Sequence, residues 1–158
     1  MSKSKTFRKK QKTGKRKTIR KQSYKYRINT PKNENKTEIV RIFLEMLNNI
    51  KLYHWKTKSY AQHKATDELY DKLNKNIDKF IETLLGKDDL RIKMLKKRVD
   101  LLDTKNTNEF KSRIYEYREF LLDMNDIFDE KRDSDILSIR DEILSDLNQF
   151  LYLLTFDK

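Results

Sequence analysis

Apolar side chains recur at three- and four-residue intervals along four long stretches of the chain, which is the spacing of one face of an α-helix. We expect the first helix over residues 38 to about 55 and the second over about 60 to 85, with Gly86 as its stop. The third covers about 108 to 128, and the fourth begins at a cap among Asp133, Ser134 and Asp135. Four amphipathic helices of this length predict an all-α four-helix bundle.

Each predicted helix has an apolar stripe that indicates which side chains form the core. These core residues are Ile39, Phe43, Met46, Leu47 and Ile50; Leu69, Leu73, Ile77, Phe80 and Leu84; Phe110, Ile114, Tyr117, Leu121, Met124 and Phe128; and Ile136, Ile139, Ile143, Leu147, Phe150, Leu151 and Leu154. Residues 87–106 are less regular, although Leu90, Met94 and Leu95 fit a short connecting helix. The length of this connection favours one long crossover between the second and third helices over a simple up-and-down order.

The composition agrees with a helical domain. The chain has 158 residues, enough for one domain, and its Gly 2 and Pro 1 leave few places for tight turns and hairpins. It has no cysteine, which excludes disulfides and thiolate metal sites and favours an intracellular location. It also has no apolar stretch of membrane-spanning length and no apolar secretory segment near Met1, so we expect no membrane association.

Positive charge is concentrated at the N-terminus. Residues 1–31 contain 13 of the 37 Lys and Arg side chains and no Asp or Glu, which leaves 24 basic and 25 acidic side chains in the remainder. We expect residues 1–36 to be a disordered basic arm and linker, with Pro31 and residues 32–36 as the linker. Thr37 then caps the first helix, and residues 37–158 form the bundle.

The arm predicts sequence-independent binding to DNA, because cations without neighbouring anions neutralise phosphates and release counterions. Phe7, Tyr24 and Tyr26 add aromatic faces on which bases can stack. A solubilising tail or a nuclear-import signal has a similar composition and stays open as an alternative. The candidate nucleic-acid-binding residues are Arg8, Lys9, Lys10, Lys12, Lys15, Arg16, Lys17, Arg20, Lys21, Lys25 and Arg27.

The two histidines of the chain, His54 and His63, are followed by a row of carboxylates on the second predicted helix. His54 continues the apolar stripe four residues after Ile50, so we expect it to point toward the buried side. His63, Asp67, Asn74, Asp78 and Glu82 fall within roughly a 100° arc of a helical wheel. Histidine and carboxylate together suit iron, manganese or zinc, whereas a plain solvated polar face is the alternative interpretation.

One chain cannot gather these groups at a single site, because Asp67 and Asp78 are about 16 Å apart along a helix. Neither histidine has a glutamate three residues before it, which is the pattern of di-iron sites within one bundle. The spacing is symmetric, however, since 63 and 82 share the midpoint 72.5 with 67 and 78. Two copies of this helix, paired antiparallel about a two-fold axis, therefore form two identical sites. Each site takes His54, His63 and Asp67 from one chain and Asp78 and Glu82 from the other.

The same residues resemble the ferroxidase signature of the Dps proteins, the ferritin-like mini-ferritins. The matching positions are Tyr53, His54, Trp55, His63, Asp67, Glu68, Leu69, Tyr70, Leu73, Asp78 and Glu82. Residues 147–154 also resemble the last helix of that family, and the similarity covers roughly residues 37–156. Trp55 is expected to pack either near the site or within the core.

The resemblance implies a ferritin-like four-helix bundle with a short helix between the second and third helices, assembled from antiparallel dimers into a dodecameric shell. It implies that ferrous iron, or another divalent metal, binds at the two-fold interfaces and is oxidised by peroxide or oxygen for storage. His54, His63, Asp67, Asp78 and Glu82 match the iron ligands by position. Many members also bind DNA, often through basic N-terminal tails, which implies a place on a nucleoid or, for a large DNA virus, in a virion, host nucleus or cytoplasm.

Two other functions stay open. A shell that has lost its iron chemistry packages DNA without catalysis, and the segment between the two histidines is shorter here than is usual in the Dps family. A basic helical adaptor that associates with RNA or ribosomes also fits the charge distribution.

Overall fold

The computed structural model describes residues 32–87, 91 and 98–156. The helices are α1 (Lys32–Lys56), α2 (Tyr60–Gly86), α3 (Thr107–Asp123) and α4 (Ser134–Leu153), with a short 3-10 helix, η1 (Met124–Asp126), after α3. These residues contain no strand, which confirms the all-helical prediction. The basic arm and the connecting helix predicted at Leu90, Met94 and Leu95 lie outside the described residues. No described helix is both long and apolar enough to cross a membrane.

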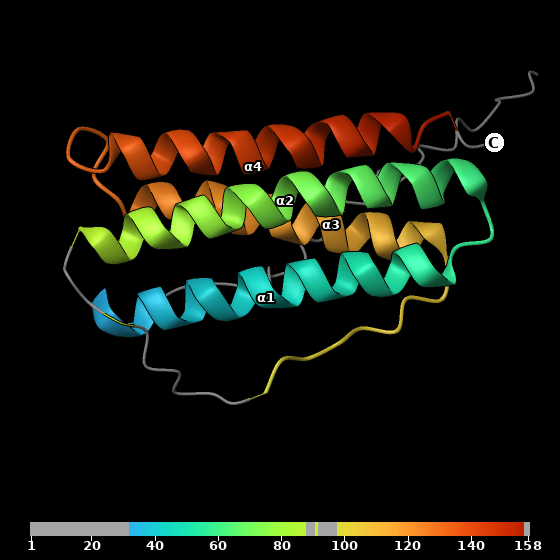
Figure 1. The fold of residues 1–158 in the computed structure, drawn as a ribbon, viewed down its shortest axis with the longest axis horizontal. Helices are drawn as coiled ribbons and strands as arrows, with labels where there is room; N and C mark the ends of the chain where they lie inside the picture. Colours follow the sequence, from blue (N-terminus) through green and yellow to red (C-terminus); the bar gives the residue numbers. More distant parts are fainter. Residues whose placement is uncertain (1–31, 88–90, 92–97, 157–158) are drawn as a thin grey trace, which may run out of the picture.

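The four long helices lie side by side along the longest dimension of the molecule (Figure 1). Helix α1 runs antiparallel to α2, whereas α2 and α3 run in the same direction and α4 returns antiparallel to both (Figure 1). Because α2 ends at the opposite end of the bundle from the start of α3, the connection between them spans the length of the bundle. The order of the helices thus contains the one crossover that the sequence predicts.

The predicted stripes meet in one core. Every predicted core residue is buried except Phe128 and Leu151, which are half-buried and pack against the core. Phe43 contacts Phe80 and Phe120 edge to face, with ring centroids 5.1 and 5.8 Å apart. Aromatic pairs of this geometry contribute about 0.5–1.5 kcal/mol each beyond the burial of their apolar area. The aromatic residues therefore join α1, α2 and α3 at the centre of the bundle.

Helix α1 begins at Lys32, so the prediction that residues 32–36 form a linker capped by Thr37 is wrong. Those residues have no apolar period, yet several of them are good helix formers. Ion pairs on the next turns stabilise this end of α1. Arg41 Nη2 lies 2.5 Å from Glu38 Oε1, and Arg41 Nη1 lies 2.9 Å from Glu45 Oε2. Pairs at these spacings stabilise helices by roughly 0.2–0.5 kcal/mol each. The helix therefore starts before its apolar stripe does.

Helix α3 ends at Asp123, earlier than the predicted end near residue 128. The side chain of Arg140 on α4 donates hydrogen bonds to the Leu121 carbonyl at 2.7 Å and to Asn125 Oδ1 at 2.9 Å. These contacts hold the last turn and the 3-10 helix against α4. Phe128 still reaches the core and lies edge to face with Phe80. The apolar stripe therefore correctly indicated that Phe128 packs against the core, although the residue is not part of the α-helix.

Asn49 attaches the crossover to the bundle. Its buried side chain donates to the Tyr117 hydroxyl at 2.7 Å and accepts from the Leu102 backbone N–H at 3.0 Å. Lys56 makes a second attachment by donating to Asp103 and to the Thr104 carbonyl. The described end of the crossover therefore lies beside α1 and fixes where α3 begins.

Candidate metal centre

The turn between α1 and α2 brings the two histidines into contact. His54 lies in the last turn of α1 and His63 in the first turns of α2, separated by the short connection at residues 57–59. Ser59 caps α2 by accepting a hydrogen bond from the Gln62 backbone N–H, which sets where the helix starts. The imidazole rings stack with centroids 3.9 Å apart and planes 24° from parallel.

Each histidine is hydrogen-bonded to the backbone of the other. His54 Nδ1 lies 3.0 Å from the His63 carbonyl oxygen, and His63 Nδ1 lies 3.0 Å from the His54 carbonyl oxygen. A carbonyl oxygen only accepts, so each Nδ1 carries a proton and donates. In a neutral ring the lone pair is then on Nε2, which is the tautomer that binds a metal through Nε2.

Thr66 supports this arrangement from the next turn of α2. Its hydroxyl is fully buried, lies 3.3 Å from His54 Nδ1 and donates to the Gln62 carbonyl at 2.7 Å. His54 itself is 7% exposed, which confirms the prediction that it faces the buried side. The ring of His54 is therefore fixed by its hydrogen bonds and by its surroundings together.

Asp67 lies next to the histidine pair. Its Oδ1 atom is 3.7 Å from His54 Nε2 and 3.4 Å from the Lys51 ammonium, and its side chain is 45% exposed. Lys51 also lies over the Tyr70 ring, 4.7 Å from its centroid. The carboxylate of Asp67 is thus placed between an imidazole nitrogen and a cation.

Asp78 and Glu82 are exposed farther along α2, so the structure brings together three of the five predicted ligands and leaves these two apart. No cluster of three or more His, Cys, Asp or Glu side chains in the described part of the chain is arranged to hold a metal ion. The shared site, completed by a second copy, stays a prediction.

Trp55 does not pack in the core of the chain. It is 70% exposed, so the expected position in the core is wrong, whereas the expected position near the shared site stays a prediction. The neighbouring Tyr53 takes the core-facing position and stacks on Phe110 with ring centroids 3.7 Å apart. Consecutive residues of a helix point in different directions. Tyr53 and His54 are buried, and Trp55 points outward.

Sequence reasoning did not identify Lys51 and Thr66 as neighbours of the site. Both are separated from a histidine by one helical turn, Lys51 three residues before His54 and Thr66 three residues after His63. Side chains at this spacing lie on the same helical face. The spacing is therefore the signal that identifies both residues.

A known protein family matches the chain. A family described as "Family of unknown function (DUF5856)" matches residues 54–154, which is more than half of the chain. The chain belongs to this family. The DUF5856 region begins at His54, includes all of α2, α3 and α4, and therefore contains all five candidate ligands. No curated protein and no solved structure matches the chain.

Proposed function

We propose that the protein is a Dps-like, DNA-binding ferritin-fold protein that oxidises ferrous iron at sites shared by two chains and sequesters it inside a shell. The observation that carries the proposal is the histidine pair, in which each Nδ1 donates to a backbone carbonyl, so that the lone pair of a neutral ring is on Nε2. Histidines that bind metals almost always have their other ring nitrogen engaged in this way.

The position of Asp67 supports the same site. Ligand atoms bound to one metal at about 2.0–2.2 Å lie roughly 3–4 Å from each other. The 3.7 Å separation between Asp67 Oδ1 and His54 Nε2 falls within that range. Imidazole nitrogen with carboxylate oxygen is also a donor set that iron accepts.

The outer face of α2 offers the remaining ligands. Antiparallel pairing about residues 72–73 places Asp67 of one copy opposite Asp78 of the other, and His63 opposite Glu82. Facing carboxylates repel each other unless a cation lies between them, and a divalent metal supplies that cation. The exposed positions of Asp78 and Glu82 leave both carboxylates accessible to a second copy.

The order of the helices is compatible with a ferritin-like fold. Ferritin-like bundles have one long crossover, and here α2 and α3 run in the same direction with such a connection between them (Figure 1). The DNA-binding part of the proposal rests on the 13 cations of residues 1–31, and implies a place on DNA inside the cell.

One observation favours the alternative of a DNA-packaging shell without iron chemistry. The Lys51 ammonium lies 3.4 Å from Asp67 Oδ1 and already neutralises part of the carboxylate that iron would need. A metal ion at this position has to displace the ammonium. The Lys51→Ala variant therefore oxidises iron faster than the wild type if the ammonium competes with the metal.

The proposal is tested by following ferrous-iron oxidation by the purified protein with peroxide and with oxygen. We expect oxidation above the protein-free background, and its loss in His54→Ala and Glu82→Ala. Glu68→Ala is the matched control, because Glu68 is an exposed carboxylate of α2 outside the predicted ligand set. No oxidation above background by the wild type contradicts the enzymatic proposal and leaves the packaging alternative.

A further inference from the structure

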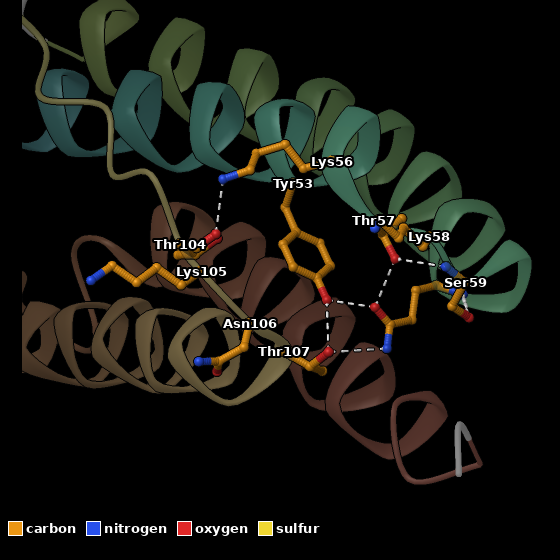
Figure 2. A pocket seen from close by; sticks show the side chains of 10 residues that line it. Tyr53, Lys56, Thr57, Lys58, Ser59, Thr104, Lys105, Asn106 and Thr107 are labelled. Carbon is orange, nitrogen blue, oxygen red and sulfur yellow. Dashed lines mark hydrogen bonds between the residues drawn. The ribbon is translucent and has the colours of Figure 1, made fainter.

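A polar cavity of about 310 Å³ lies at the end of the bundle where α1 meets α2, on the side of the crossover (Figure 2). It is formed by the end of α1, the start of α2, the crossover and the start of α3. The lining residues are Tyr53, Lys56, Thr57, Lys58, Ser59, Gln62, Thr104, Lys105, Asn106 and Thr107. None of them is a candidate metal ligand, so the cavity is separate from the site proposed above.

All ten lining side chains have an N–H or O–H group. Tyr53, Thr57 and Gln62 use theirs within the lining and Lys56 donates to Asp103, so Lys58 and Lys105 supply the positive charge that a ligand can meet. Three of the ten lining residues are lysines, and none is a carboxylate, although the chain has 25 Asp and Glu residues. A cavity that combines donors with positive charge selects an anion. Its volume is at the lower end of the range for small-molecule sites, which is about 300–1,000 Å³.

Buried polar groups hold the floor of the cavity in place (Figure 2). The Tyr53 hydroxyl and the Thr57 hydroxyl both donate to Gln62 Oε1, and Gln62 Nε2 donates to Thr107 Oγ1 at 3.3 Å. The ring of Tyr53 is stacked on Phe110, so its face is not available to stack on a nucleobase. Recognition in this cavity therefore depends on polar and charged groups rather than on stacking against Tyr53.

The three lysines of the cavity differ in their contacts with carboxylates. Lys56 is held by Asp103 and the Thr104 carbonyl, whereas the ammonium groups of Lys58 and Lys105 make no ion pair with a carboxylate of the described residues. Lys105 extends away from Tyr53 in Figure 2, and its flexible four-carbon stem allows the ammonium to turn toward a bound anion. The first turns of α2 and α3 add partial positive charge at the same place.

We propose that this cavity binds a phosphate group, carried either by a small phosphate compound or by the backbone of a nucleic acid. Phosphate is the common biological anion that matches several N–H and O–H donors with lysines around them. In the nucleic-acid case, the folded domain contributes a DNA contact of its own in addition to the arm.

The test compares the full-length protein with Lys58→Ala/Lys105→Ala. The control is Lys64→Ala/Lys131→Ala, which removes the same charge from two exposed lysines outside the cavity. Binding of inorganic phosphate is measured by equilibrium dialysis at constant ionic strength, and thermal unfolding confirms that both variants fold. We expect at least a tenfold weaker affinity for phosphate in the cavity variant only.

Duplex DNA binding, measured over a range of salt concentrations, distinguishes the two sources of phosphate. Each lysine that contacts DNA contributes about 0.9 to the slope of log K against log salt, so the cavity variant has a smaller slope if the phosphate belongs to DNA. Loss of phosphate binding with an unchanged slope assigns the site to a small phosphate compound. The proposal is overturned if the cavity and control variants behave alike in both measurements.

Discussion

Thr66 shows how one hydroxyl can connect the histidine pair to the helix that carries it. The hydroxyl donates to the Gln62 carbonyl and lies next to His54 Nδ1, and no part of the residue is exposed. A buried polar group without a partner costs about 1–3 kcal/mol, so these contacts matter for stability as well as for the orientation of the imidazole.

We expect Thr66→Val to lower the free energy of unfolding by about 1 kcal/mol, because it removes the buried hydrogen bonds while conserving shape. Urea denaturation measures the change. The control is Thr83→Val, since the Thr83 hydroxyl makes the same kind of bond, to the Lys79 carbonyl at 2.8 Å, in an exposed position. Equal losses in the two variants contradict the role assigned to Thr66.

Single residues also show the limit of sequence reasoning about the site. The apolar stripe that includes Ile50 correctly predicted a buried His54. The reciprocal hydrogen bonds between His54 and His63 depend on the path of residues 57–59, which no periodicity encodes. The ion pair between Lys51 and Asp67 joins two helices, and contacts of that kind follow only from the packing of α1 on α2.

Between elements, Lys87 fastens the end of α2 to the start of α4. Its ammonium donates to Asp133 at 2.9 Å, to Asp135 at 2.8 Å and to the Arg132 carbonyl at 2.7 Å. The hydrogen bonds from Lys87 lower the pKa values of both carboxyl groups below the ordinary Asp value. The hydrogen bonds to Asp135 and Asp133 in turn raise the pKa of Lys87.

This contact predicts a pH dependence of stability. A lowered carboxyl pKa contributes stability that is present above the unfolded value of about 3.9 and is lost as the pH falls through the folded value. Lys87→Met removes that contribution, so its urea midpoint depends less on pH than that of the wild type in the acidic range below about pH 4. Lys131→Met is the control, and identical pH profiles for the two variants contradict the assignment.

The elements themselves were largely predictable, because the core packs through stripes that are visible in the sequence. The start of α1 was not, since residues 32–36 are helical without contributing an apolar stripe. The end of α3 was predicted too late, because the apolar stripe continues beyond the last residue of the helix. Phe128 continues the stripe into the core, but the α-helix ends at Asp123 and a 3-10 turn follows, where Arg140 contacts the Leu121 carbonyl.

The molecule as a whole combines a nearly neutral folded part with a strongly basic N-terminus. All 13 cations of the arm lie within residues 1–30. We expect deletion of residues 1–30 to abolish retention of DNA at low salt while ferrous-iron oxidation continues at the wild-type rate. Electrophoretic mobility shift at several salt concentrations measures retention. Unchanged retention refutes the role assigned to the arm.

Assembly is the second property of the whole molecule. The shared site requires at least a dimer, and the resemblance to Dps proteins implies a larger shell. Light scattering during size-exclusion chromatography gives the mass in solution. A species of 19.3 kDa, the mass of one chain, removes the shared-site proposal altogether.

The central claim is that His63 of one chain and Glu82 of another belong to the same iron site. Mixing the His63→Ala and Glu82→Ala chains, by co-expression or by refolding together, tests it most directly. Each mixed dimer then has one intact site, so random pairing restores about a quarter of the wild-type sites although each variant alone has none. We predict that the mixture regains ferrous-iron oxidation to about that level. A mixture as inactive as its two components contradicts the claim.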